Sequence, residues 1–336
     1  AGQHAHHLGG RGMLQCNHLD LAVADLVDTA NDADQALNID GTVGNNQHVG
    51  SRVGRQVALL RHQRPQDRHQ LGCRDIVHLH HAGNHFIAPA RGLLPDDWGA
   101  QRRTLQRIAT HVLAQARFRH DGMFDLTALP GGFGTPPVGP DRERVRLVGG
   151  SMFVERVTGA DVYTMTATTD VVTVAGSSIA ALCQSIGFEP DPGFWVGNDT
   201  PPLGDPDEMI VLDSLSAQVA GEWYLLGQRA IDEAVASLPD AQASVGRLWP
   251  EHFDHRIDLA ASPGVRCNLG AAAGDGFSDE PYLYVGPWDA GRHGSPDYWN
   301  APFGAVLGYG DVDASSDPLG RAVEFLLEGI TNLRSG

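Results

Sequence analysis

The strongest constraint on the fold is a stretch of alternating residues in the C-terminal third of the chain. From Phe253 to Leu259, apolar and polar side chains alternate with a period of two, which is typical of a β-strand with one buried face. The alternation resumes from Val265 to Leu269, after a Ser-Pro-Gly sequence at residues 262–264. Two alternating runs joined by such a loop predict an antiparallel hairpin.

The length of the loop decides which residues pair. A two-residue turn of Pro263 and Gly264 would pair Leu259 with Asn268 and mix apolar and polar side chains on each face. A three-residue loop pairs Leu259 with Cys267 instead, and it leaves Gly264 where a left-handed conformation is needed. Because a slip of one residue moves every side chain to the opposite face, we predict the three-residue loop.

This register separates the two faces of the hairpin. Asp258 is predicted opposite Asn268, with Arg256 nearby, on a polar face. His255 and Ile257 are predicted on the apolar face. The polar face is therefore a candidate for binding, and His255 is expected to be a core histidine whose hydrogen bonds are satisfied.

Aromatic residues are distributed very unevenly along the chain. Of the 23 Phe, Trp and Tyr residues, only Phe86 lies in residues 1–97. A segment with so few large side chains buries too little surface to offset the entropy of ordering it. We therefore predict a poorly ordered N-terminal extension at residues 1–97 and a single domain at residues 98–336.

Within residues 98–336, strand patterns cluster and do not alternate regularly with helices. Apolar residues at helical spacing predict amphipathic helices at residues 99–117, after the caps Asp213 and Asp317, and after Ser177 or Ser178. We therefore predict an α+β fold in which an antiparallel sheet is packed by several amphipathic helices. Residues 187–208 carry five prolines and four glycines, which is typical of a long structured loop and often of a functional one.

The composition excludes several classes of partner and location. All 24 basic residues are arginine, against 41 acids, and the net charge of -17 argues against nucleic acid or an anionic membrane surface as partner. No apolar run reaches the roughly 18 residues of a membrane span, and no signal-peptide pattern is visible. The 4 cysteines lie far apart without a C-x-x-C motif, which favours reduced thiols in the cytoplasm. The oligomeric state is left open.

Glu251, His252, Asp254 and His255 form a cluster with the pattern E-H-x-D-H. Carboxylates and imidazoles can hold a divalent metal, and with Asp275 they could carry the acid–base steps of a metal-assisted hydrolase. However, His252 and His255 are three residues apart, and a strand would point their rings to opposite faces. The alternatives are that Glu251 and His252 shape the bend into the strand and that Asp275 belongs to a solvated turn. No cofactor is predicted beyond a possible divalent metal.

Tyrosines on a neighbouring strand offer a second kind of site. Tyr282 and Tyr284 share one strand face, and they would complete an aromatic-walled polar cleft if that face adjoins the polar face of the hairpin. The cleft would be lined by Trp249, Arg256, Asp258, Asn268, Tyr282 and Tyr284. Plain sheet packing is the alternative, since strands favour tyrosine. We predict small-ligand binding as the preferred function and a metal-assisted hydrolase using Glu251, His252 and Asp254 as the alternative.

Four segments carry a resemblance to a known family. The Leu-Trp-Pro-Glu-His-Phe-Asp run at 248–254, Asn268–Gly270, Gly274–Asp275 and the Glu-Pro-Tyr-Leu-Tyr run at 280–284 resemble a bacterial family common in actinobacteria and described only as a domain of unknown function. The resemblance covers residues from about 98 to the C-terminus. It implies no activity, so the predicted functions depend on the residues themselves.

Overall fold

The computed structural model describes residues 94–159, 165–289 and 291–335. The predicted N-terminal extension lies outside these ranges, apart from its last few residues. The described helices are α4 (Trp98–Ile108), the π-helix η2 (Ala109–Ala114), α5 (Gln115–Asp121), α6 (Ile179–Ile186), α7 (Ser214–Ala236), α8 (Tyr309–Asp313) and α9 (Pro318–Arg334). The described strands are β1 (Thr127–Leu129), β2 (Gly132–Gly134), β3 (Arg144–Val148), β4 (Ser151–Thr158), β5 (Thr166–Thr173), β6 (Gln242–Ala243), β7 (Arg247–Trp249), β8 (Asp254–Ser262), β9 (Val265–Ala272), β10 (Tyr282–Pro287) and β11 (Ala305–Gly308).

The predicted α+β class is confirmed, with the described strands divided between two antiparallel sheets. A five-stranded sheet has the order β1-β2-β3-β4-β5, so each strand pairs with the next along the chain. A six-stranded sheet has the order β11-β10-β9-β8-β6, and β7 also pairs with β8. Two backbone hydrogen bonds between Leu126 and Leu248, of 2.7 and 3.0 Å, connect the segments before β1 and in β7.

The hairpin of β8 and β9 has the predicted register but a different tip. Leu259 pairs with Cys267 and Asp258 with Asn268, as predicted. The predicted three-residue loop is wrong in detail, because Ser262 pairs with Val265 and only two residues form the tip. A β-bulge between Ala260 and Ser262 absorbs the extra residue, so the faces stay separated despite the tighter turn.

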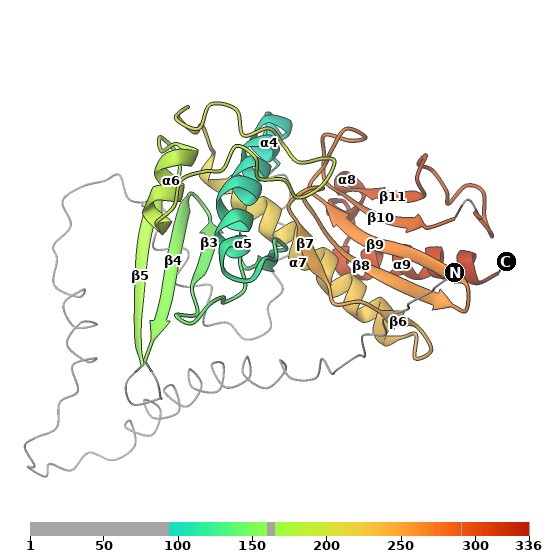
Figure 1. Ribbon diagram of the computed structural model, residues 1–336. Helices are drawn as coiled ribbons and strands as arrows, with labels where there is room; N and C mark the ends of the chain where they lie inside the picture. Colours follow the sequence, from blue (N-terminus) through green and yellow to red (C-terminus); the bar gives the residue numbers. More distant parts are fainter. Residues whose placement is uncertain (1–93, 160–164, 290, 336) are drawn as a thin grey trace, which may run out of the picture. The chain divides into compact units, whose positions relative to one another are not determined.

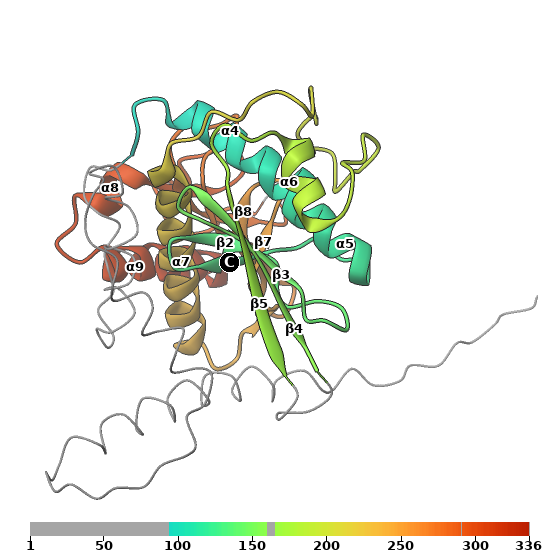
Figure 2. The same cartoon turned by 90° about the vertical axis from the view of Figure 1, so that its left-hand side faces the viewer.

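Helix α7 packs against both sheets at two glycines. A Cβ atom on Gly221 would lie 2.2 Å from the backbone nitrogen of Gly132 in β2, and one on Gly227 would lie 2.3 Å from the Cβ of Ala271 in β9. Figure 1 shows α7 between the green strands of the five-stranded sheet and the orange strands of the six-stranded sheet, and Figure 2 shows β2 beside it. The absence of a side chain at these two positions allows both close approaches.

Three aromatic rings join the two sheets through this helix. Tyr224 of α7 lies edge-on to Phe133 of β2 and to Phe253, at ring-centre separations of 6.4 and 5.6 Å. Phe253 is fully buried, but it precedes β8 and has a positive φ of 53°. The prediction that Phe253 belongs to the alternating strand is therefore wrong, because its backbone turns there to direct the ring into the core.

The six-stranded sheet has one apolar face and one polar face. Helices α7 and α9 contact its strands, and the buried side chains of this face include Ile257, Leu259, Leu269, Leu283 and Val285. The opposite face carries the polar residues of the hairpin. Across the described ranges, no helix combines the length and apolarity that a bilayer crossing requires.

Candidate functional site

The strand register brings the predicted ligand-binding residues onto one face. Directly paired residues of neighbouring strands point to the same side of a sheet. The three rows across β8, β9 and β10 are Arg256, Gly270 and Tyr284; Asp254, Ala272 and Tyr282; and Asp258, Asn268 and Gly286. Trp249 of β7 pairs with Asp254 and shares this face. We call these residues the polar–aromatic face.

Gly270 gives the centre of this face its shape. A Cβ atom at this position would lie 2.4 Å from the ring of Tyr284, so the ring lies directly over the bare backbone of β9. From there the Tyr284 hydroxyl reaches across to β8 and donates a hydrogen bond to Asp254 Oδ2. The glycine is therefore required for the contact between the tyrosine and the carboxylate.

Asp254 is a buried carboxylate at the edge of the face. Asp254 is only 3% exposed, and burial raises the pKa of its carboxyl group. Arg256 at 3.9 Å and the Tyr284 hydroxyl act in the opposite direction, because both favour the charged form of Asp254. Its other oxygen, Oδ1, has no hydrogen-bond partner among the described residues. A buried acceptor without a donor is costly and is typical of a site that a ligand or water completes.

Two arginine–tryptophan stacks lie on the same face. The guanidinium of Arg256 is 5.4 Å from the ring centre of Trp249, and that of Arg266 is 4.3 Å from the ring centre of Trp288. Asp258, which was predicted to lie near Arg256, forms an ion pair with Arg266 instead. The indole of Trp288 donates a hydrogen bond of 3.0 Å to Asn268. Neither arginine was expected to stack, because sequence spacing does not show side-chain direction.

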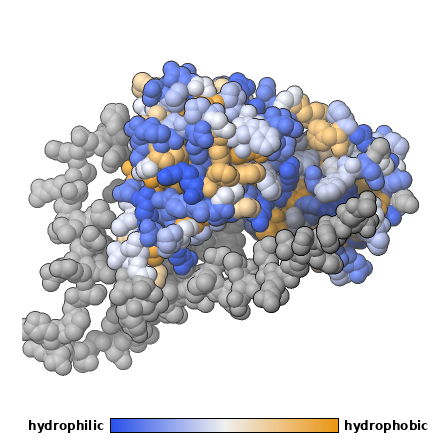
Figure 3. All heavy atoms as spheres, viewed as in Figure 1, coloured by the Kyte–Doolittle hydropathy of each residue, from blue (hydrophilic) through white to orange (hydrophobic). Residues whose placement is uncertain are grey.

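Exposed rings continue the face beyond β10. Phe303 lies edge-on to Tyr284, with ring centres 6.4 Å apart, and Phe277 lies 5.2 Å from Phe303. Phe277 and Phe303 are 46% and 38% exposed. The space-filling view shows hydrophobic and hydrophilic residues side by side over the region of the six-stranded sheet (Figure 3). Such a surface offers both stacking and hydrogen-bonding contacts.

Asp275 does not join Glu251 and His252, with which it was grouped as a catalytic candidate. Its Oδ1 accepts backbone hydrogen bonds from Phe277 and Ser278 at 2.7 and 3.2 Å, which is the turn role considered as the alternative. Its Oδ2 accepts a 2.6 Å hydrogen bond from Tyr282, and burial, together with this bond, raises the pKa of Tyr282. Asp275 therefore positions the tyrosine and the turn.

Glu251 and His252 are joined by a residue that the sequence did not suggest. Asp199 lies in the loop between α6 and α7, and its Oδ2 is 3.2 Å from His252 Nδ1. Glu251 Oε1 is 3.7 Å from His252 Nε2, and potential ligand atoms of all three residues lie within 4.8 Å of one another. The proline- and glycine-rich composition of residues 187–208 was the only signal that pointed to this loop.

The backbone of the same loop makes room for the Glu251 carboxylate. A Cβ atom on Gly197 would lie 1.9 Å from Glu251 Cδ, and Gly197 has a positive φ of 148°. The hydroxyl of Thr200 donates a 2.5 Å hydrogen bond to the Gly197 carbonyl. The Glu251 side chain is consequently only 17% exposed, in contact with the loop that carries Asp199.

Side chains of the π-helix η2 and of its neighbour α4 form hydrogen bonds with the backbone around this cluster. Gln106 donates a 2.7 Å hydrogen bond to the Glu251 carbonyl, and Thr110 donates one of 3.4 Å to the Pro250 carbonyl. His111 contacts the Pro201 carbonyl at 2.8 Å. Sequence periodicity predicted one helix at residues 99–117 but not its π-helical section, a feature frequent at functional sites.

The two histidines of the predicted cluster, His252 and His255, face different environments, but His252 lies in the turn before β8, so strand alternation is not the cause. His252 is 37% exposed in its side chain, whereas His255 is only 3% exposed and lies on the apolar face. Burial lowers the pKa of His255 to about 4. His255 is therefore buried in the core as predicted, but its Nδ1 has no hydrogen-bond partner among the described residues, so the expectation of a satisfied histidine is wrong.

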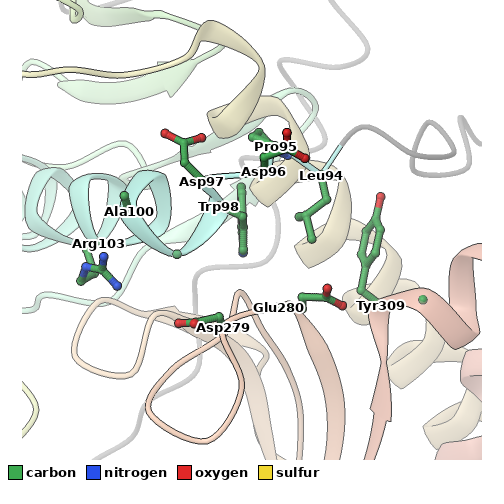
Figure 4. Close-up of a pocket in the computed structure, with 12 residues that line it drawn as sticks. Leu94, Pro95, Asp96, Asp97, Trp98, Ala100, Arg103, Asp279, Glu280 and Tyr309 are labelled. Carbon is green, nitrogen blue, oxygen red and sulfur yellow. The ribbon is translucent and has the colours of Figure 1, made fainter.

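A cavity of about 680 Å³ lies beside the start of α4. None of the six predicted ligand-binding residues lines it. Figure 4 shows Trp98 and Leu94 facing Glu280 and Tyr309, with Asp279 below. The Trp98 indole donates a 2.9 Å hydrogen bond to the Ala273 carbonyl. This bond ties the Trp98 side of the cavity to the residue that follows β9.

Comparisons of the chain with family models, with curated proteins and with solved structures return no match. The resemblance to the actinobacterial family of unknown function therefore stays a prediction.

Proposed function

We propose that the chain binds a small organic ligand on the polar–aromatic face. The observation that carries this proposal is the pairing register, which aligns Arg256, Gly270 and Tyr284 in one row beside the buried Asp254. The glycine lets the Tyr284 ring lie over the backbone of β9, on the same face as Arg256. Asp254 contributes an acceptor without a protein partner among the described residues.

The test is thermal stabilisation of the purified full chain by a metabolite library. At least one compound is expected to raise the melting temperature, and Arg256→Gln is expected to abolish that shift. The matched control is Arg321→Gln, because Arg321 lies on α9, which packs against the opposite face of the sheet. The proposal fails if no compound stabilises the protein or if both variants lose the response equally.

A second candidate is a metal-assisted hydrolase, favoured by the placement of Asp199 beside Glu251 and His252. Two carboxylates and an imidazole suit a divalent ion such as Zn²⁺ or Mn²⁺. An ion held there would supply a bound water of lowered pKa. The cluster includes neither Asp254 nor Asp275, so this candidate uses a different set of acids from the one that the sequence suggested.

Elemental analysis of the purified protein tests the second candidate. One equivalent of a divalent ion is expected in the wild type and is expected to be lost in His252→Ala and Asp199→Asn. Asp205→Asn is the control, because Asp205 lies in the same loop outside the cluster. A wild type that binds no ion even after incubation with Zn²⁺ or Mn²⁺ would rule this candidate out.

We also propose a cytoplasmic location and no nucleic-acid or membrane partner. Cys183 and Cys267 are buried free thiols, and burial raises the pKa of each to about 12, which keeps them protonated and unreactive. The net charge of -17 supports the exclusion of polyanionic partners.

A further inference from the structure

The polar–aromatic face carries the same three-residue arrangement twice. In the first, Arg256 stacks on Trp249 and pairs with Asp254. In the second, Arg266 stacks on Trp288 and pairs with Asp258. The two aspartates lie four residues apart on β8, on the same side of the strand.

The charges within each arrangement compensate each other. Each carboxylate faces an arginine and each arginine faces a carboxylate, so neither an anion nor a cation finds an unmatched partner. A neutral ligand that both donates and accepts hydrogen bonds suits such a surface better than a charged one. The local charge balance is notable because the whole chain is strongly acidic.

Both aspartates also have an unused acceptor. Asp254 Oδ1 and Asp258 Oδ1 are shielded from water and have no hydrogen-bond partner among the described residues. A ligand hydroxyl group or a bound water can supply the missing donor only where a neighbouring side chain shifts to expose the oxygen. The neighbouring rings of Trp249, Trp288 and Phe303 offer apolar surface for the C–H groups of such a ligand.

From these contacts, and on the basis of the proposed ligand-binding function, we propose that the ligand is a short neutral oligosaccharide. Sugars combine hydroxyl donors and acceptors with apolar C–H faces, which matches the two arrangements. Four residues of a strand span about 13 Å. This separation exceeds one sugar ring, so the two arrangements form consecutive subsites for linked sugar units.

The test is affinity gel electrophoresis of the full chain in gels containing hydroxyethyl cellulose, mixed-linkage β-glucan, xylan or soluble starch. At least one polysaccharide is expected to retard the wild type. Calorimetry with the matching oligosaccharide is then expected to show that Trp249→Ala and Trp288→Ala each weaken binding by about tenfold. Trp288 is 58% exposed, so its replacement is expected to leave folding intact.

The matched control is Trp195→Ala, because Trp195 is 67% exposed and lies in the loop between α6 and α7. Its affinity is expected to equal that of the wild type. Absence of retardation in every gel, or equal weakening in all three variants, overturns the oligosaccharide assignment. If a non-sugar metabolite nevertheless stabilises the protein in an Arg256-dependent way, the proposed function stands and only the ligand class is wrong. If no compound binds, both proposals are wrong.

Discussion

The Tyr284 hydroxyl donates a hydrogen bond to Asp254, 30 positions away in the chain. Tyr284 lies on β10 and Asp254 on β8, so the bond crosses β9 above Gly270. It satisfies one oxygen of a carboxylate that burial would otherwise leave without a donor. The centre of the candidate binding face therefore depends on a tyrosine, a glycine and an aspartate from three different strands.

Removing only the hydroxyl of Tyr284 tests the value of this bond. Tyr284→Phe leaves Asp254 Oδ2 without its donor, and we expect a loss of about 1–3 kcal/mol in the free energy of unfolding. Urea denaturation at neutral pH measures it. Tyr309→Phe is the control, because Tyr309 lines the cavity beside α4 instead, and its loss is expected to stay within about 0.5 kcal/mol. Equal losses in the two variants would contradict the assignment.

Gly270→Ala tests the shape of the face. The new Cβ atom would lie 2.4 Å from the Tyr284 ring, so the ring must move and its hydrogen bond with Asp254 must break. We expect a destabilisation of about 1–3 kcal/mol and loss of ligand binding. Gly276→Ala has no neighbouring atom within 4 Å of its Cβ and is expected to leave both properties unchanged. Denaturation and the thermal-shift assay measure the two effects.

Gly227→Ala sets helix propensity against packing. Replacing a glycine inside a helix by alanine normally stabilises by about 1 kcal/mol. Here the new Cβ would lie 2.3 Å from the Cβ of Ala271, and overpacking of this kind costs about 1–3 kcal/mol or more. We expect the cost of overpacking to exceed the gain in helix propensity, with a net loss of about 1–2 kcal/mol in the free energy of unfolding, measured by urea denaturation. Gly310→Ala in α8, which meets no atom within 4 Å, is expected to be neutral or stabilising.

His255 is expected to make the fold sensitive to acid. Its pKa falls from 6.5 to about 4 on burial, so the unfolded chain binds more protons between these values. The stabilisation is complete above pH 6.5 and is lost as pH falls toward 4. We expect this residue to account for about 2 kcal/mol of the stability lost between pH 7 and pH 5.

His255→Leu removes that contribution, so the pH 7 to pH 5 difference in unfolding free energy should shrink by a similar amount. His293→Asn is the control, because His293 is exposed and should keep the wild-type difference. A wild-type slope in His255→Leu would show that other groups cause the acid sensitivity. Equilibrium denaturation at the two pH values provides the comparison.

Short-range pattern was enough to predict the faces of the hairpin. The alternation around Ile257 and Leu269 fixed which side chains are buried, because a slip of one residue would have exposed all of them. The two-residue tip with its bulge was not predicted, since a bulge changes the residue count without changing the pattern. Helix starts at Ser178, Asp213 and Asp317 were also confirmed, because capping is local chemistry.

Contacts between distant segments could not be predicted in the same way. Asp199 reaches His252 from a loop without periodicity, so no pattern in the sequence related the two residues. The pairing of β9 with β10 placed Tyr284 beside Arg256, but their separation in the chain left that arrangement open. The close packing of α7 on both sheets likewise occurs at Gly221 and Gly227, which helical spacing alone does not show.

Because α7 contributes Tyr224 to the rings of both Phe133 and Phe253, each sheet owes part of its hydrophobic core to the same helix. A fragment that kept one sheet without α7 would expose this aromatic surface to water, and a fragment that kept α7 would expose its other side. The two sheets should therefore unfold in a single cooperative transition. Local unfolding of the five-stranded sheet should also disturb the turn at Phe253, which leads into the binding face.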